Sequence, residues 1–138
     1  MLEWKEADSA EEAQSLSGVL FPDLSGNPVI RSMELAACFY MSGLLELRYE
    51  DNSDNSLIIR KTGRRTPKLS GDYSSYPCSY DLPCKGVILH CRGTEEHISC
   101  CEFDPFGGSV SIQMNPGMIG QGLAKPDLLD LAGAFILQ

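Results

Sequence analysis

Residues that could bind a metal or attack a substrate are concentrated between His90 and Cys101. This stretch also holds Cys91, His97 and Cys100. Zinc takes nitrogen or sulfur ligands in a tetrahedron, and a thiolate becomes a nucleophile when a nearby base activates it. The residue types therefore fit either a zinc site or a thiol-dependent site.

The spacing of these residues weakens both hypotheses. Neighbours in a strand point to opposite faces of a sheet, so only one member of each adjacent pair can reach a given ion. The chain has no C-x-x-C pair, and no third residue is placed to orient a Cys–His pair. We keep a thiol- or zinc-dependent site in the hairpin over 87–103 as the alternative hypothesis. Its metal ligands would be His90, His97 and Cys101, whereas the leading hypothesis requires no cofactor.

A second group of versatile side chains consists of Asp72, Tyr73 and Tyr76. Gly71 and Asp72 favour a tight turn, and the two tyrosines are spaced as on one turn of a helix. The tyrosines could line a groove, or they could pack over the core while each hydroxyl makes a hydrogen bond. Packing is the more frequent role of such tyrosines. If they line a groove instead, Asp72, Tyr73 and Tyr76 are the candidate ligand-binding residues.

Other patterns point less clearly to chemistry. The acidic and amide residues of 51–55 could bind calcium, but they lack the glycine and distal glutamate of an EF-hand, so a solvated turn is favoured. The basic stretch 62–68 could bind an anion, although such runs are usually solvated connectors. No nucleophile-elbow, Walker or dinucleotide motif occurs. The sequence therefore predicts a protein that is not an enzyme.

Length and charge narrow the function further. The 138 residues fit one domain, and a net charge of −8, with 19 acidic and 11 basic residues, argues against nucleic acid as a partner. A membrane-spanning helix needs about 18 apolar residues in a row, and no such run exists. The N-terminus lacks an apolar signal core, so we expect a cytoplasmic protein with free thiols.

The clearest structural element is a hairpin over 44–61. In its first strand, three apolar residues alternate with three charged ones, which predicts one core face and one solvated, charged face of an antiparallel sheet. Polar residues at 51–55 form the turn, and 57–59 begin the second strand. The alternating residues are Leu45, Leu47 and Tyr49 against Glu46, Arg48 and Glu50.

A helix is expected near each end of the chain. Ser9 and Glu12 form a capping box and Gly18 follows as a stop, which predicts a helix over 10–17. Pro126 fits a first helical turn, and an apolar stripe follows at helical spacing. The stripe could face the sheet or a partner, and core packing is favoured because the sheet needs a cover. It consists of Leu128, Leu131, Ala132, Phe135 and Ile136.

Further strands are predicted between the helices, and consecutive hairpins imply a meander. The predicted fold is α+β: an antiparallel β-sheet meander with a short N-terminal helix and a C-terminal helix packed on the sheet. The additional strands are 29–37, 85–91, 98–103 and 109–114, with 80–83 irregular and a loop over 115–123. Residues 33–38 could instead form a helical turn. We expect a single domain over 1–138, divided into an N-terminal helix and loop (1–28), the sheet (29–114) and a loop with the C-terminal helix (115–138).

Several stretches within residues 29–138 carry a family resemblance: LELRYEDNSDNSLIIRKTGR, LSGDYSSY, KGVILHCRG, GGSVSIQMNPGM and KPDLLDLAGAFI. In this order they resemble a family of small bacterial domains of unknown function, found alone or attached to anti-sigma-factor-like or lipoprotein segments. The most specific part is SGDY with a later tyrosine. The resemblance implies an antiparallel sheet with terminal helices and no established catalysis. The chain departs from the family pattern at 102–106, where Trp and Tyr are expected.

These observations favour a non-enzymatic module that binds a protein segment or a small ligand. The binding surface would be the face of the sheet or an exposed strand edge. The sequence leaves the oligomeric state open.

Overall fold

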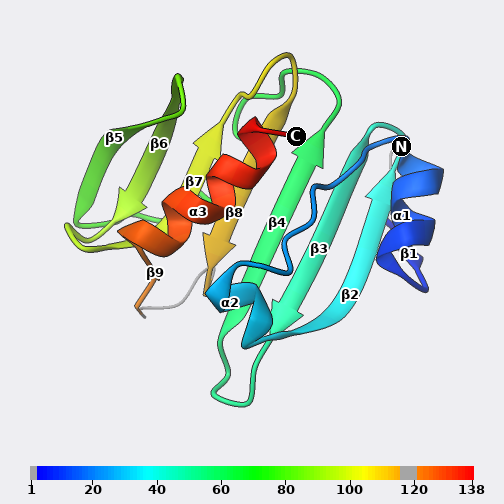
Figure 1. The fold of residues 1–138 in the computed structure, drawn as a ribbon, viewed down its shortest axis with the longest axis horizontal. Helices are drawn as coiled ribbons and strands as arrows, with labels where there is room; N and C mark the ends of the chain where they lie inside the picture. The colour runs from blue at the N-terminus through cyan, green and yellow to red at the C-terminus, as the bar shows by residue number, and fades with distance from the viewer. Residues whose placement is uncertain (1–2, 116–120) are drawn as a thin grey trace.

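The structure is a computed structural model that describes residues 3–115 and 121–138. The strands are β1 (Lys5–Ala7), β2 (Glu34–Met41), β3 (Leu44–Glu50), β4 (Ser56–Thr62), β5 (Cys78–Cys84), β6 (Val87–Gly93), β7 (His97–Phe103), β8 (Ser109–Met114) and β9 (Leu123–Ala124). The helices are α1 (Ala10–Ser17), α2 (Pro28–Arg31) and α3 (Lys125–Ile136) (Figure 1). The predicted α+β class, with its antiparallel sheet and its helix near each end, is confirmed.

The sheet is assembled from two meanders. Strands β1 to β4 follow one another in space, as do β5 to β8, and β4 pairs with β8 to join the two sets. The resulting order is β1-β2-β3-β4-β8-β7-β6-β5, with β9 paired to β7. Residues 63–77 carry the chain from the central β4 to the far edge at β5, and we call them the crossover segment.

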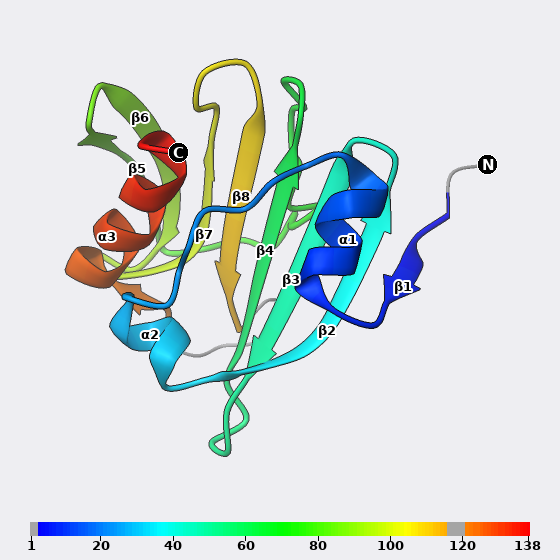
Figure 2. The same ribbon diagram turned by 45° about the vertical axis from the view of Figure 1, so that its right-hand side comes forward.

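Both long helices pack on the same face of the sheet (Figure 2). Helix α1 covers one end of the sheet. The core beneath it includes Ala13 of the helix and Cys38 and Leu47 of the sheet. Helix α3 covers the other end and turns its predicted apolar stripe toward the sheet. Leu128 and Leu131 of this stripe are buried in the same core cluster as Ile112. The hairpin over 44–61 supplies the middle of this core, as expected.

Helix α1 has the bounds that its capping signals predict. The Ser9 hydroxyl accepts a hydrogen bond from the backbone N–H of Glu12 at 3.1 Å. Gly18 ends the helix with φ of 74°, a left-handed conformation that glycine adopts without strain. These signals are local in sequence, which explains why the prediction succeeds.

The strand predicted over 29–37 is wrong in its first half, where the chain forms α2. The side chain of Asn27 accepts hydrogen bonds from the backbone N–H groups of Val29 and Ile30, and Pro28 occupies the first turn. An N-cap followed by proline is a helix start signal that outweighs the β-branched residues. The strand begins only at Glu34.

The prediction that 80–83 is irregular is also wrong. Strand β5 pairs with β6 along its whole length, and the connection is a two-residue turn at Lys85 and Gly86, both with positive φ. The strand predicted to start at Lys85 therefore starts at Val87. Pro83 is compatible with β5 because β5 lies at the edge of the sheet.

The sheet extends beyond the predicted range of 29–114, since β1 and β9 lie outside it. Residues 116–120 of the loop predicted over 115–123 lie outside the described residues. In residues 3–115 and 121–138, no helix is long and apolar enough to cross a membrane.

Candidate functional site

The face of the sheet opposite the helices, here called the open face, carries mostly polar side chains. In the described residues no helix covers it. Cross-strand register places eleven side chains there: Phe39, Glu46, Arg48, Ile58, Arg60, His90, Arg92, Cys100, Glu102, Ser111 and Gln113.

Glu46 is the centre of an ion-pair network on this face. Its side chain is only 1% exposed, although the sequence predicted a solvated position. One carboxylate oxygen accepts from Arg48 Nε at 2.5 Å and the other accepts from Arg60 Nε at 2.6 Å. A carboxylate this deeply buried requires such partners, because a lone buried charge is very costly.

An aromatic ring packs against each of the two arginines. The guanidinium carbon of Arg48 lies 4.8 Å from the centroid of the Phe39 ring, and that of Arg60 lies 5.5 Å from the Trp4 ring. Each guanidinium is thus fixed by a carboxylate and by a ring face. The Trp4 contact joins the residue before β1 to the central strand β4.

The crossover segment lies across the open face and is held by its main chain. Arg60 Nη1 donates to the carbonyl oxygens of Leu69 at 3.1 Å and Ser70 at 3.0 Å. Arg92 Nη2 donates to the carbonyl oxygen of Asp72 at 2.8 Å. Arginines from two strands thereby fix the path of the segment.

The structure brings together two of the three predicted ligand-binding residues. The Asp72 carboxylate accepts hydrogen bonds from the Tyr76 hydroxyl and from the backbone N–H of Ser74. Tyr73 stands apart from them: it is 75% exposed, and its ring lies 5.5 Å from Lys68 Nζ. Tyr76 therefore has the packing role, whereas Tyr73 is free to meet a ligand.

The Asp72–Tyr76 pair is a structural contact. Burial acts to raise the pKa of Asp72, but the hydrogen bonds from Tyr76 and Ser74 outweigh it, so the pKa is lowered. Burial and the hydrogen bond to Asp72 both raise the pKa of Tyr76. The tyrosine thus stays protonated and the aspartate ionised near neutral pH, which stabilises the turn.

Two hollows flank the crossover segment on the open face. One, of about 320 Å³, is lined by Ile58, Arg60, Ser70, Gly71, Asp72, Tyr73, Ser74 and Gln113. We call it the turn hollow. The other, of about 260 Å³, lies toward β6 and β7 and includes Lys68, His90 and Glu102 in its lining. Asp72 and Tyr73 thus line a hollow, as the ligand-binding hypothesis requires.

The sheet beneath the crossover segment has an unusually polar interior. Gln113 is only 4% exposed, and the fully buried hydroxyl of Ser111 has no hydrogen-bond partner among the described residues. Burying such groups costs free energy unless they are hydrogen-bonded. This part of the sheet is therefore not optimised as an apolar core.

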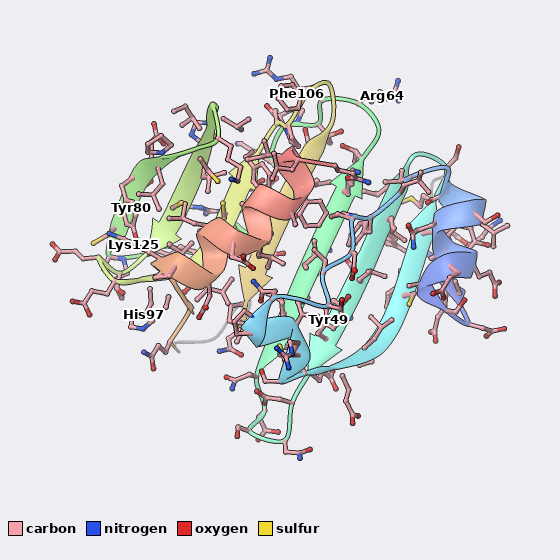
Figure 3. The ribbon with its side chains drawn as sticks, viewed as in Figure 1. Tyr49, Arg64, Tyr80, His97, Phe106 and Lys125 are labelled. Atoms are coloured by element: carbon pink, nitrogen blue, oxygen red, sulfur yellow. The ribbon has the colours of Figure 1, made fainter. Side chains whose placement is uncertain are left out.

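The metal ligands of the alternative hypothesis are not brought together. His90 lies on the open face with its Nδ1 2.9 Å from an Asp81 carboxylate oxygen, whereas Cys101 faces the core under α3. His97 lies at the start of β7 beside Gln121 (Figure 3). Within residues 3–115 and 121–138, no three His, Cys, Asp or Glu side chains gather in a way that could hold a metal ion.

The cysteines are free, and five of the six are buried. Cys91 and Cys101 face each other across β6 and β7. The interaction between the two thiols lowers the pKa of Cys91 and, together with burial, raises that of Cys101 well above its usual range. Burial raises the pKa of Cys100, which lies beside Arg92 on the open face. These thiols are poorly placed to attack a substrate because they do not reach solvent.

A hollow larger than the turn hollow lies on the helix side of the molecule. It has a volume of about 620 Å³ and lies between α3, the 23–27 loop and the β5–β6 turn. Asp23, Lys85, Asp130 and Leu137 are among its lining residues. It is a rival binding surface, against which the open face must be tested.

The residues that sequence reasoning missed on the open face are Glu46, Arg48 and Arg60. The alternation in β3 assigned Glu46 and Arg48 to a solvated face, and nothing local indicated that Glu46 is buried. Arg60 and Trp4 are distant in sequence, so only the register of β3 and β4 and the path of the N-terminus reveal the cluster.

No protein-family model, curated protein or solved structure significantly matches this chain. The resemblance to small bacterial domains of unknown function thus remains a prediction.

Proposed function

We propose that this protein is a non-enzymatic module that binds a protein segment on its open face. The proposed surface consists of Phe39, Arg48, Ile58, Tyr73 and the turn hollow. The observation that carries the proposal is the fixed position of Arg48, held by Glu46 and Phe39 next to this hollow.

The composition of the surface supports a binding role. Tyrosine, tryptophan and arginine are the residue types that contribute most binding energy at protein interfaces. Tyr73 is exposed, and Trp4 is partly exposed beside Arg60. Because Glu46 already holds Arg48, this side chain would lose less conformational entropy when a partner binds.

The open face is a better candidate than either edge of the sheet. In a two-residue hairpin, the two residues that flank the turn form a hydrogen-bonded pair, so the backbone of Cys84 bonds to β6. Hydrogen-bonded pairs alternate along the strand, so the ring nitrogen of the preceding residue, Pro83, faces away from β6. Proline has no N–H to donate to an added strand. The other edge, β1, has three residues, which offer few hydrogen bonds.

The chemistry of the open face favours binding over catalysis. Cys100 is buried, and Arg92, whose guanidinium donates to its sulfur, cannot serve as a general base. The resemblance to bacterial domains without established catalysis supports the same proposal. We propose a cytoplasmic protein, because a chain with six free cysteines fits a reducing compartment.

Peptide display tests this proposal even though the partner is unidentified. Peptides selected from a random library on the immobilised wild-type protein are titrated against two variants, Tyr73→Ser and Leu137→Ser. Tyr73 lines the turn hollow, and Leu137 is a matched exposed residue that lines the hollow beside α3.

We expect Tyr73→Ser to weaken the selected peptides by about tenfold or more, as removal of a hot-spot aromatic does. Leu137→Ser should leave their affinity unchanged. The opposite pattern, with affinity lost in Leu137→Ser and kept in Tyr73→Ser, would assign binding to the helix side and refute the proposal.

A further inference from the structure

We infer that Arg48 binds a carboxylate group of the partner, while the adjoining apolar side chain of the partner occupies the turn hollow. This inference rests on the proposed function and adds the chemistry that the partner must carry. It makes Arg48 the residue that determines specificity on the open face.

The first argument is that Arg48 retains donors without acceptors. Its Nε donates to Glu46, but its two terminal nitrogens donate to no acceptor among the described residues. The side chain is 44% exposed. Phe39 and Glu46 fix the guanidinium from two directions, so the remaining donors are held ready for a ligand.

The second argument is that Arg60 provides an internal precedent. Arg60 donates its Nε to the same carboxylate and lies against a ring, as Arg48 does. Its Nη1 is occupied by two oxygen acceptors, the carbonyls of Leu69 and Ser70. Arg48 is therefore held in the same way as Arg60, but the described residues supply no oxygen acceptors for its terminal nitrogens.

The third argument is the position of Arg48 relative to the turn hollow. Arg48 pairs with Ile58 across β3 and β4, and Ile58 pairs with Gln113 across β4 and β8. Ile58 and Gln113 both line the hollow. Adjacent strands lie about 5 Å apart, which is roughly the distance from the carboxylate of an amino acid to the tip of its side chain. One residue of a partner can therefore reach both places.

The fourth argument is charge. Arg48, Arg60 and Glu46 together carry one net positive charge, on a chain whose net charge is −8. A guanidinium binds a carboxylate through two parallel hydrogen bonds, the strongest type of polar contact available to it. The carboxylate is a C-terminus, because only in a C-terminal residue do the free carboxylate and the apolar side chain belong to the same residue.

Small carboxylates test the inference directly by NMR. The probe is N-acetyl-leucine, compared with N-acetyl-leucinamide, which lacks the charge. A third probe, N-acetyl-Asp-Leu-amide, has a side-chain carboxylate only and should bind more weakly than N-acetyl-leucine if the C-terminal carboxylate is the group that is recognised. The readouts are the Nε–H signal of Arg48 and the amide signals of Ile58 and Gln113.

We expect N-acetyl-leucine to shift these signals with a dissociation constant on the order of millimolar, and the amide to leave them unmoved. Arg48→Lys keeps the charge that Glu46 requires, so the fold is retained, but it loses the planar fork. The variant should bind the probe about tenfold more weakly or worse. Arg31→Lys, in an exposed residue of α2, is the control and should bind as wild type.

The inference is overturned if the acid and the amide shift the same signals equally, or if every arginine responds alike to the acid. Its failure is distinguishable from failure of the proposed function. Peptides that lose affinity in Tyr73→Ser but bind Arg48→Lys as wild type would keep the open face as the binding surface and remove the role of Arg48.

Discussion

Glu46 explains at the level of single residues why the open face is ordered. Its carboxylate is nearly inaccessible, and both of its oxygens accept from arginines that are themselves partly exposed. The network therefore converts two flexible surface side chains into fixed ones. The same arrangement makes Glu46 a sensitive position for stability.

Replacing Glu46 by Gln should destabilise the protein by about 2–4 kcal/mol, because the two arginines would keep their charge and lose their shared partner. Urea denaturation measures the change. Glu50→Gln, an exposed position in the same strand, is the control and should change stability by about 0.5 kcal/mol or less. A Glu46→Gln variant as stable as the control would mean that the network contributes nothing.

Asp72 gives the crossover segment an acid-sensitive anchor. Its folded-state pKa lies below the ordinary value of 3.8. The ionised group therefore contributes stability above that value, and this contribution is lost as the pH falls through the folded-state pKa.

Asp72→Asn, which does not titrate, should lose less stability than wild type between about pH 5 and about pH 2. Urea denaturation of both proteins at the two pH values measures the difference. An equal loss in the two proteins would contradict the anchoring role of the ionised carboxylate.

At the level of elements, Asn27 connects the N-terminal part of the chain to the C-terminal helix. Its Oδ1 caps α2, and its Nδ2 donates to the Asp130 carboxylate at 2.8 Å and to the Asp127 carbonyl at 3.2 Å. One buried side chain thus positions both α2 and α3.

Asn27→Ala should cost about 1–3 kcal/mol of stability, because the cap is lost and buried polar groups remain unpaired. Thermal or urea denaturation measures it. Asn52→Ala, in the exposed β3–β4 turn, should be nearly neutral by comparison. If the two variants are equally stable, Asn27 does not couple the two helices.

Elements with local signals could be predicted from the sequence, and those that depend on distant partners could not. The bounds of α1 follow from Ser9 and Gly18, which lie next to the helix. Strand β5 contains Pro83 and forms a strand because β6 pairs with it along its full length. The burial of Glu46 depends on Arg60 in the neighbouring strand, so periodicity alone assigned it to solvent.

In the candidate site, too, features with local signals could be predicted and those that depend on distant strands could not. The sequence predicted a tight turn at Gly71 and Asp72, whereas the structure has the turn just before them, at residues 67–70, closed by a hydrogen bond from the Gly71 N–H to the Lys68 carbonyl. Asp72 and Tyr73 line a hollow. The sequence could not reveal that the crossover segment lies on the open face, because this depends on the β4–β8 pairing. Arg48 was missed because its contact with Phe39 and its position beside Ile58 depend on how β3 pairs with β2 and β4.

At the level of the whole molecule, burial predicts how the thiols react. Cys78 is the partly exposed cysteine, and the other five are buried. Titration with an aromatic disulfide should modify one thiol rapidly in the folded protein and the rest only on unfolding. Cys78→Ser should remove the rapid phase. Two or more fast thiols in this variant would revive the thiol hypothesis for the 87–103 hairpin.

The central claim is that the face without helices is the binding surface of the molecule. The most direct measurement is an NMR chemical-shift map of the isotope-labelled protein titrated with the strongest display-selected peptide. We predict that the perturbed amides cluster in β3, β4, β8 and residues 70–74, around Arg48 and Ile58. Perturbations centred instead on Lys85, Asp130 and Leu137, beside α3, or along the β5 edge would contradict the account.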